Sequence, residues 1–270
     1  MLKRLLEKRI SPITEKRIRR LLPDKYKDLP IFVYKKTDST NTRAKEYAEN
    51  FGNAPAVFIA DLQTAGRGRL GRSFYSPKGH GLYISFLLRP EDRANDALMT
   101  TAYAAVVMSD TLKAQTELSP RIKWVNDIIC GEKKLAGILT VGSFSEDGDR
   151  LSYAICGIGV NVTKASMPEE LSLIATSIEE QTGRKYDRCS LAAHLIDAFL
   201  SSLHTVGTNE CCESYRSYSL LPGKRVKVEK KSCSYEAEVL GISDRFELIL
   251  KLDSGETEFL STGEVSVRFR

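Results

Sequence analysis

A stretch of glycine and arginine lies between two apolar runs, and it constrains the fold more than any other part of the chain. Residues 63–72 read Gln-Thr-Ala-Gly-Arg-Gly-Arg-Leu-Gly-Arg, and the apolar runs occupy 56–60 and 82–88. Those runs have the length and composition of buried strands. Glycine permits sharp bends and close approach to a ligand, and arginine supplies a permanent planar cation. We therefore predict two core strands joined by an anion-binding loop, called the Arg–Gly loop below.

The same loop has the spacing of a dinucleotide-binding fingerprint. Gly66, Gly68 and Gly71 match its three glycines, and two acidic residues follow about twenty positions later. That fingerprint requires a helix at the third glycine. Residues 72–81 contain proline and glycine, which do not continue a helix. We exclude a dinucleotide site of this type, and a solvated surface loop is the plainer alternative to an anion site.

The composition is that of an ordinary globular protein. The 270 residues are 42% apolar and 28% charged, and they suffice for one large core or for a large and a small domain. No apolar run approaches the roughly 18 residues of a membrane span. The six cysteines and three histidines lack zinc-ligand spacing. We expect reduced, buried thiols and a cytoplasmic location, with a transit peptide as the minor alternative.

Positive charge is concentrated at the start of the chain. The net charge is +5, and residues 1–20 hold eight basic residues against two acids. Nucleic-acid binding is one interpretation of such a segment. However, only about 30 residues precede the first expected strand, which is short for a three-helix recognition module. We predict that residues 1–30 form a short basic arm and that the protein does not bind specific DNA.

Hydrophobic periodicity divides the rest of the chain into two regions. Residues 31–220 alternate between strand and helix patterns, and residues 221–270 consist of short alternating runs separated by turns. We predict an α+β fold, in which a mixed sheet flanked by helices is followed by a small barrel. Strands are expected at 31–34, 56–60, 82–88, 122–124, 135–141 and 152–162, with a hairpin turn at 145–149. Helices are expected at 13–22, from the capping residues 39–41 to Gly52, and at 95–118, 190–204 and 209–219.

Motifs in chain order resemble those of the biotin protein ligases. They are Asp-Ser-Thr-Asn at 38–41, the Arg–Gly loop, Lys-Trp-Val-Asn-Asp at 123–127, Lys-Lys-Leu-Ala-Gly at 133–137 and Gly-Ile-Gly-Val-Asn at 157–161. The resemblance runs from about Val33 to the C-terminus, where Glu264-Val-Ser-Val-Arg268 is similar to the closing strand of the family. It implies a catalytic domain over 31–220, an SH3-like barrel over 221–270, and a form that lacks the N-terminal DNA-binding domain of the larger members.

The resemblance also implies a reaction. Family members join biotin and ATP into biotinyl-5′-adenylate with release of pyrophosphate, and then pass the biotinyl group to a lysine of a biotin carboxyl carrier protein. A carboxylate must approach a negatively charged phosphorus, so the site has to offset their repulsion. No protein nucleophile is required, because positioning and charge stabilisation suffice. Magnesium would screen the pyrophosphate, and its protein ligands are left unassigned.

Site residues follow from the matched motifs. The residues expected to bind biotin are Ser39, Thr40, Asn41, Gln63, Arg67, Gly68, Arg69 and Lys134, the first four because a ureido ring needs paired donors and acceptors. The residues expected to bind the nucleotide are Arg69, Arg72, Phe74, Asn126 and Asn161. The residues expected to act in catalysis are Arg69, Lys134, Asp127 and Lys123.

Two positions depart from the family pattern. Phe74 stands where the family often has tryptophan, so a stacking face is kept and an indole N–H is lost. Val125 replaces the proline of Lys-Trp-Pro-Asn-Asp, which removes a turn constraint but spares the polar groups. Simpler roles also fit several residues: Ser39 and Thr40 as helix caps, Asn126-Asp127 and Asn161 as turn residues, and the single tryptophan, Trp124, as part of the core.

Three functions remain from the sequence. A biotin–protein ligase, acting as a monomer or homodimer on a biotin carboxyl carrier protein, is the first. A lipoate or octanoate ligase or transferase of the same fold is the second, although the Arg–Gly loop and the trailing barrel favour biotin. A nucleic-acid-binding module that uses the basic arm is the third.

Overall fold

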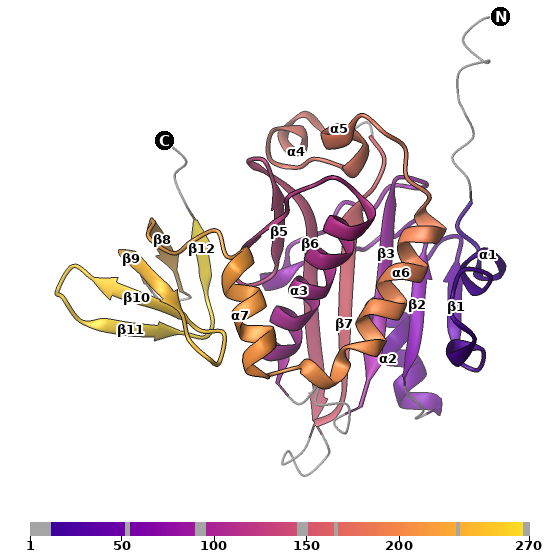
Figure 1. The fold of residues 1–270 in the computed structure, drawn as a ribbon, viewed down its shortest axis with the longest axis horizontal. Helices are drawn as coiled ribbons and strands as arrows, with labels where there is room; N and C mark the ends of the chain where they lie inside the picture. Colours follow the sequence, from indigo (N-terminus) through magenta and orange to yellow (C-terminus); the bar gives the residue numbers. More distant parts are fainter. Residues whose placement is uncertain are drawn as a thin grey trace, which may run out of the picture.

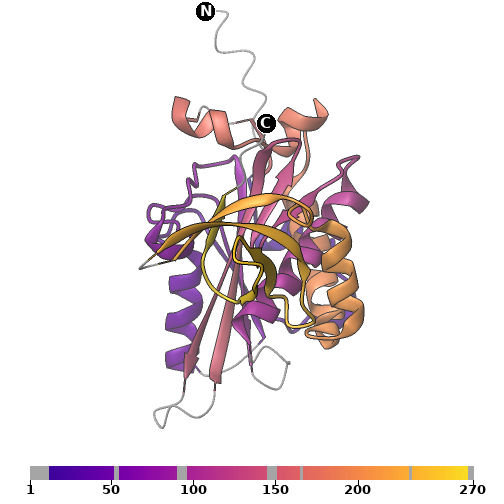
Figure 2. The same ribbon diagram turned by 90° about the vertical axis from the view of Figure 1, so that its left-hand side faces the viewer.

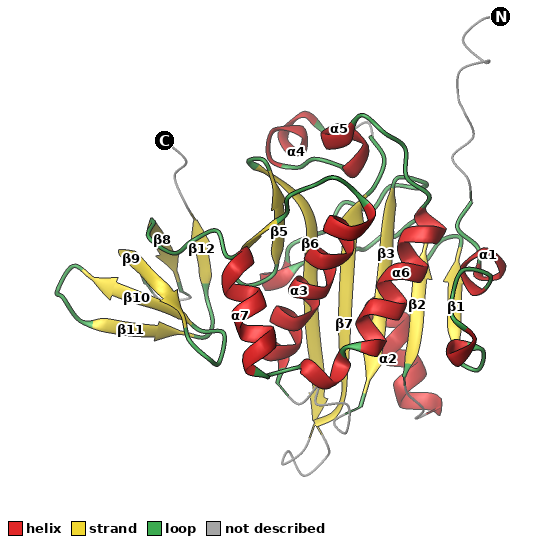
Figure 3. Cartoon of the chain, viewed as in Figure 1, coloured by secondary structure: helices red, strands yellow, loops and turns green. Residues whose placement is uncertain are grey.

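Two β-sheets organise the chain. The computed structural model describes residues 12–51, 55–89, 96–144, 151–164, 167–230 and 233–266. A seven-stranded sheet has the order β1-β2-β3-β7-β6-β5-β4, and a five-stranded sheet follows beside it (Figure 1). Helices flank the larger sheet, so the predicted α+β architecture is confirmed (Figure 3). The predicted turn at 145–149 and the helix-ending Gly52 lie outside the described residues.

The larger sheet is mostly antiparallel. Only β1 and β2 pair in parallel among the described strands of this sheet, and every other neighbour runs antiparallel. Strands β2 and β3 are buried at every position, which explains their continuous apolar sequences. The strands are β1 (Ile31–Tyr34), β2 (Ala56–Ala60), β3 (Gly81–Leu88), β4 (Arg121–Lys123), β5 (Asp127–Cys130), β6 (Lys133–Phe144) and β7 (Leu151–Asn161).

Helices cover both faces of this sheet. Helices α3 (Ala97–Gln115), α6 (Arg188–Ser201) and α7 (Asn209–Tyr218) lie on one face, and α2 (Thr40–Phe51) lies on the other (Figure 2). The start of α3 is capped by Asp96, whose side chain accepts hydrogen bonds from the two backbone N–H groups of Leu98 and Met99. None of the helices within the described ranges combines the length and apolar character needed to cross a membrane.

The short helices were the hardest to predict. Helix α1 spans only Glu15–Arg19 instead of 13–22, and a 3-10 turn over Asp24–Tyr26 follows. Helices α4 (Glu169–Ile174) and α5 (Ile178–Thr182) were not predicted. One or two turns are too short for a helical period to emerge. The start of α5 does carry a local signal, because the Ser177 side chain accepts from the N–H of Glu180.

The C-terminal sheet is a small antiparallel module. Its strand order is β11-β10-β9-β8-β12, and buried and exposed residues alternate along β8. Within the described residues, β11 and β12 do not pair, so the sheet is open, although its order is compatible with the predicted SH3-like barrel. The strands are β8 (Arg225–Glu229), β9 (Ser234–Ile242), β10 (Leu248–Leu252), β11 (Thr257–Leu260) and β12 (Glu264–Ser266).

The two sheets share one hydrophobic core. Trp124 is buried, as predicted, and its indole N–H donates to the carbonyl of Phe246 at 2.8 Å. The hydroxyl of Tyr215 on α7 donates to the carbonyl of Val125 at 3.3 Å, and its ring meets Phe246 edge-on. The turn between β4 and β5 is therefore held from behind by α7 and the C-terminal sheet together.

The stack of Phe199 on Phe86 yields a stability prediction. The two rings are fully buried and parallel, with centroids 4.0 Å apart, and join α6 to β3. We expect Phe199→Ala to lower the free energy of unfolding by about 3–5 kcal/mol in urea denaturation, because it leaves a cavity. The control Leu173→Ala, at a side chain 70% exposed, should change it by less than about 0.5 kcal/mol. Equal effects of the two changes would contradict this account.

Candidate functional site

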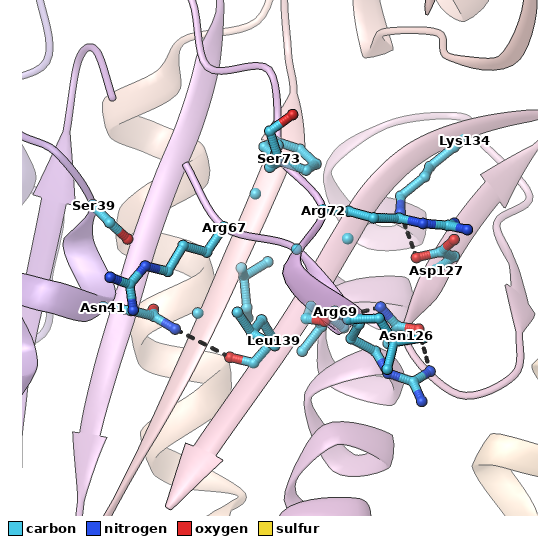
Figure 4. A pocket seen from close by; sticks show the side chains of 18 of the residues that line it. Ser39, Asn41, Arg67, Arg69, Arg72, Ser73, Asn126, Asp127, Lys134 and Leu139 are labelled. Atoms are coloured by element: carbon cyan, nitrogen blue, oxygen red, sulfur yellow. Dashed lines mark hydrogen bonds and ion pairs between the residues drawn. The ribbon is translucent and has the colours of Figure 1, made fainter. Parts of the chain in front are cut away.

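A cleft opens between the Arg–Gly loop, strands β6 and β7, and the start of α2 (Figure 4). Its empty volume, including the part open to solvent, is about 970 Å³. The predicted site residues that line it are Ser39, Thr40, Asn41, Gln63, Arg67, Gly68, Arg69, Arg72, Phe74, Lys123, Asn126, Asp127 and Lys134.

The Arg–Gly loop is folded as a narrow extension of the β2–β3 pair. The N–H of Phe74 donates to the carbonyl of Gly66 at 2.9 Å, and the N–H of Gly68 donates to the carbonyl of Arg72 at 2.7 Å. Leu70 and Gly71 form the tip with φ values of 55° and 75°, a region that favours glycine. A Cβ on Gly66 would lie 2.4 Å from the carbonyl oxygen of Phe74, so this position requires glycine.

One end of the cleft, the polar end, is rich in hydroxyl and amide groups and lies beside Arg67 (Figure 4). The N–H and hydroxyl of Thr40 both donate to Oε1 of Gln63, at 2.8 and 3.1 Å. The buried hydroxyl of Ser85 donates to Oδ1 of Asn41 at 2.5 Å and lies 2.7 Å from Oγ1 of Thr40. Ser85 is a member of this network that the sequence analysis missed, because it lies inside an apolar strand run. The network fixes the side chains in place, so Thr40 does more than start α2.

A glycine makes room for that polar end. A Cβ on Gly157 would lie 2.2 Å from Oδ1 of Asn41, closer than any two such atoms approach. Asn41 in turn donates through Nδ2 to the carbonyl of Leu139 at 3.4 Å (Figure 4). The amide of Asn41 can therefore lie flat across β6 and β7 only because β7 has no side chain at this position.

The middle of the cleft is aromatic. A Cβ on Gly159 would lie 2.5 Å from the Phe74 ring, and one on Gly137 would lie 3.4 Å from it. The ring of Tyr83 meets Phe74 edge-on, with centroids 6.4 Å apart. Burial raises the pKa of Tyr83 well above its usual value, so its neutral hydroxyl donates to the carbonyl of Pro77 at 3.0 Å. Tyr83 lines the cleft and was not predicted.

The other end of the cleft is charged. Nζ of Lys134 lies 2.5 Å from Oδ1 of Asp127. The guanidinium of Arg69 donates to Oδ1 of Asn126 and to the carbonyl of Gly263, both at 3.1 Å. Asn126 is itself fixed, because its Nδ2 donates to the carbonyl of Ile138 at 3.0 Å. Figure 4 shows this group well separated from Ser39, Asn41 and Arg67. The cleft thus has distinct polar and cationic ends.

The C-terminal sheet completes the rim. Glu264 pairs with Arg72, and the carbonyl of Gly263 accepts from Arg69. These residues and Val265 line the cleft, although the sequence analysis placed Glu264 only in a closing strand. The closing motif was the sequence signal that marked Glu264. Its spacing did not indicate a contact with the Arg–Gly loop, because Glu264 lies 192 positions after Arg72.

Two of the predicted site residues, Asn161 and Lys123, differ in whether they line the cleft. Asn161 is not among the residues that line the cleft, and its Nδ2 donates to the carbonyl of Thr176 at 2.9 Å, which ties the end of β7 to the segment before α5. Lys123 does line the cleft, at the end of β4. The peptide bond between Trp124 and Val125 is cis. The turn that carries Asn126 and Asp127 is held without the family's proline, because the N–H of Ile138 donates to the carbonyl of Asn126 at 3.0 Å.

The charge of the lining favours a polyanion. Five cationic side chains, Arg67, Arg69, Arg72, Lys123 and Lys134, face two carboxylates, Asp127 and Glu264. An excess of positive charge in a cleft raises the local concentration of anions. Among the described residues, no group of three or more His, Cys, Asp or Glu side chains has the arrangement of a metal site. A divalent ion would here need ligands from the substrate as well.

Comparisons with known proteins agree on one family. The profile of the Biotin/lipoate A/B protein ligase family matches residues 33–161. A biotin–[acetyl-CoA-carboxylase] ligase of Paracoccus denitrificans is 30% identical over 82% of this chain and 93% of its own length. The bifunctional ligase/repressor BirA of Bacillus spizizenii is 34% identical over 80% of this chain and 68% of its own length.

A solved structure extends the agreement to the fold. Biotin protein ligase from Aquifex aeolicus, in complex with biotin and ATP, superposes with a TM-score of 0.75 and 30% sequence identity, over 88% of this chain and 98% of that one. The cleft with a polar and a cationic end, the strand order and these similarities lead to one conclusion: the chain belongs to the biotin protein ligase family.

Proposed function

We propose that the protein is an ATP-dependent biotin–protein ligase. It forms biotinyl-5′-adenylate from biotin and ATP and transfers the biotinyl group to a lysine of a biotin carboxyl carrier protein. The observation that carries this proposal is the division of one cleft into an end rich in hydroxyl and amide groups and a cationic end. The neutral ureido ring of biotin needs the first, and the carboxylate of biotin and the phosphates of ATP need the second.

The polar end would hold the ureido ring of biotin. Ser39, Thr40, Asn41 and Gln63 supply hydroxyl and amide groups that both donate and accept. The internal bonds among Thr40, Gln63 and Ser85 keep these groups in fixed positions before a ligand arrives. Such preorganisation reduces the ordering that binding would otherwise require.

The cationic end would bring the two acids together. Arg69 and Lys134, which line the cleft, would stand beside the carboxylate and the α-phosphate, and Phe74 would offer a flat face to the adenine ring. Arg72 and Lys123 add positive charge for the phosphates. Magnesium bound with ATP would screen the leaving pyrophosphate, while the carboxylates of the lining, Asp127 and Glu264, are engaged by Lys134 and Arg72. In the transfer step, the unprotonated amine of the carrier lysine would attack the acyl carbon of the anhydride, the bond from that carbon to AMP would break, AMP would leave, and the amine would lose a proton.

The cell compartment and partner follow from the same chemistry. The described cysteines are all free, and five of them are buried, which suits a reducing compartment. We therefore place the reaction in the cytoplasm. The enzyme acts as a monomer or homodimer on a biotin carboxyl carrier protein. We expect it not to bind specific DNA.

The direct test uses the protein with ATP, magnesium, biotin and a biotin carboxyl carrier domain. Mass spectrometry of the carrier should show one added biotinyl group. Lipoate in place of biotin should leave the carrier unmodified, and pyrophosphate exchange into ATP should depend on biotin. Modification with lipoate but not with biotin would favour the lipoate ligase alternative and refute this proposal.

Lys134 and its neighbour Lys133 form a matched pair. Lys134 points to Asp127 in the cleft, whereas the exposed Lys133 donates to the carbonyl of Ser172. We expect Lys134→Ala to lower biotin-dependent pyrophosphate exchange at least about 100-fold. The carboxylate and the α-phosphate are both negative, and the variant lacks a cation that offsets their repulsion. Lys133→Ala should stay within about threefold of the wild type. Normal exchange by Lys134→Ala at saturating ATP would contradict the role of this lysine.

Arg69 should govern how long the intermediate stays bound. Its guanidinium joins the Arg–Gly loop to Asn126 and Gly263 across the charged end. We expect Arg69→Gly to release biotinyl-adenylate about 10- to 100-fold faster than the wild type in a dilution experiment, because a charge-assisted clamp is lost. Arg184→Gly is the control, since Arg184 is an exposed arginine paired with Glu117. An unchanged release rate for Arg69→Gly would rule this role out.

Gly157 should determine the affinity for biotin. A Cβ at this position would displace the Asn41 amide, so Gly157→Ala is expected to raise KM for biotin about tenfold or more, with a smaller change in KM for ATP. Gly241→Ala is the matched control, because no atom lies within 4 Å of a Cβ built on Gly241. Equal rises in both KM values would show instead that Gly157→Ala disturbs the whole cleft.

A further inference from the structure

A buried arginine outside the cleft holds the base of the Arg–Gly loop. Arg188 is the first residue of α6 and is only 3% exposed, which is rare for a charged side chain. Its Nη1 lies 2.6 Å from Oδ1 of Asp61 and donates to the carbonyl of Gly81 at 3.2 Å. Asp61 directly follows β2, and Gly81 is the first residue of β3. One guanidinium thus joins the two ends of the segment between these strands.

The segment between those two ends supplies much of the cleft. Its backbone is also tied at the base, because the N–H of Gly79 donates to the carbonyl of Asp61 at 3.2 Å, and the N–H of Asp61 donates to the carbonyl of Tyr34 at 2.9 Å. A shift of this base would therefore be passed along the segment toward the groups that line the cleft. The residues of the segment that line the cleft are Gln63, Arg67, Gly68, Arg69, Leu70, Arg72, Ser73 and Phe74.

A second route leads from Arg188 to the aromatic centre of the cleft. Tyr83 lies over Gly81, where a Cβ would come within 2.3 Å of its ring. Tyr83 meets Phe74 edge-on, and Phe74 covers Gly159 of β7. A shift of Gly81, whose carbonyl accepts from Arg188, would move the tyrosine ring and with it the Phe74 face.

The energetics of a buried ion pair favour a positioning role. Desolvation of two charges offsets most of their attraction, so such a pair contributes little net stability compared with apolar residues of the same size. Nη1 of Arg188 does, however, fix two acceptors at defined positions. A lysine side chain ends one bond earlier, so its ammonium would lie farther from both acceptors, and an apolar side chain has no donor. Arg188 therefore contributes mainly by fixing the positions of Asp61 and Gly81, and little to the net stability of the fold.

We propose that Arg188 is a positioning residue for the ligase reaction, which fixes the base of the Arg–Gly loop and thereby sets Arg69 and Phe74 against β6 and β7. Its effect on catalysis rests on the proposed function. Its effect on the loop does not, because loop opening can be measured without any substrate.

The test uses Arg188→Lys, which keeps the charge but ends one bond short of the position of Nη1, the atom that donates to Asp61 and Gly81. Trypsin cleavage after Arg67, Arg69 and Arg72, mapped by mass spectrometry, should become about tenfold faster than in the wild type. KM for ATP in the adenylation assay should rise about tenfold, with a smaller fall in kcat. Asp61→Asn, which keeps an acceptor for Arg188, should remain closer to the wild type in both measurements and serves as the conservative variant.

Phe199→Leu is the control for a general loss of stability. Phe199 lies on the same helix, but it packs against Phe86 and Tyr103. With each protein held at the same interval below its own Tm, Phe199→Leu should show wild-type trypsin cleavage and wild-type KM. Cleavage and KM unchanged in Arg188→Lys, or changed equally in Phe199→Leu, would overturn the proposal. A wild-type protein that forms no biotinyl-adenylate would refute the proposed function, while the trypsin comparison would still decide the role of Arg188 in the loop.

Discussion

The architecture depends on holding an excess of positive charge inside one cleft. Cations that face each other repel, so a cleft of this kind is stable without ligand only where acceptors oppose them. For three of the five cations of the lining, the structure supplies these acceptors from separate elements: Asp127 at the start of β5 for Lys134, Asn126 and the carbonyl of Gly263 for Arg69, and Glu264 of β12 for Arg72. An incoming carboxylate and phosphate would replace these acceptors, so binding exchanges internal partners for substrate and adds little new unpaired charge.

The glycines explain why these elements can meet. At Gly66, Gly157 and Gly159, a side chain would overlap a backbone carbonyl, an amide or an aromatic ring within 2.5 Å. None of these three positions has the left-handed backbone that usually demands glycine. Glycine is required at these positions because there is no space for a side chain. Strand β7 has no side chain where Asn41 and Phe74 cross it, and the Arg–Gly loop has none where its two arms pair. The sheet therefore serves as a flat floor, and the specificity of the cleft resides in the groups laid on it.

Much of this organisation could be predicted because its signals are local. The apolar runs at 56–60 and 82–88 and the Arg–Gly loop between them specify two core strands and a cationic connection, and the strands formed as expected. What could not be predicted depends on long-range contacts. Arg72 meets Glu264 across 192 positions and Arg188 meets Asp61 across 127, and no pattern near either residue encodes its partner. Asn161 differs from these residues, because a local motif predicted that it contacts the nucleotide, whereas its amide donates to the carbonyl of Thr176.

The C-terminal sheet belongs to the site as well as to the fold. On the outer side it places Gly263 and Glu264 against the Arg–Gly loop, and from behind it supplies the carbonyl of Phe246 to the Trp124 indole. The cleft residues Asn126 and Asp127 lie between these two contacts, in the turn that follows Trp124. A change in how this sheet packs would alter both the rim that holds the arginines and the turn that faces them. The charged end of the cleft is thus built jointly by both sheets, whereas the polar end, formed by α2, β3 and the start of the loop, depends on the larger sheet alone.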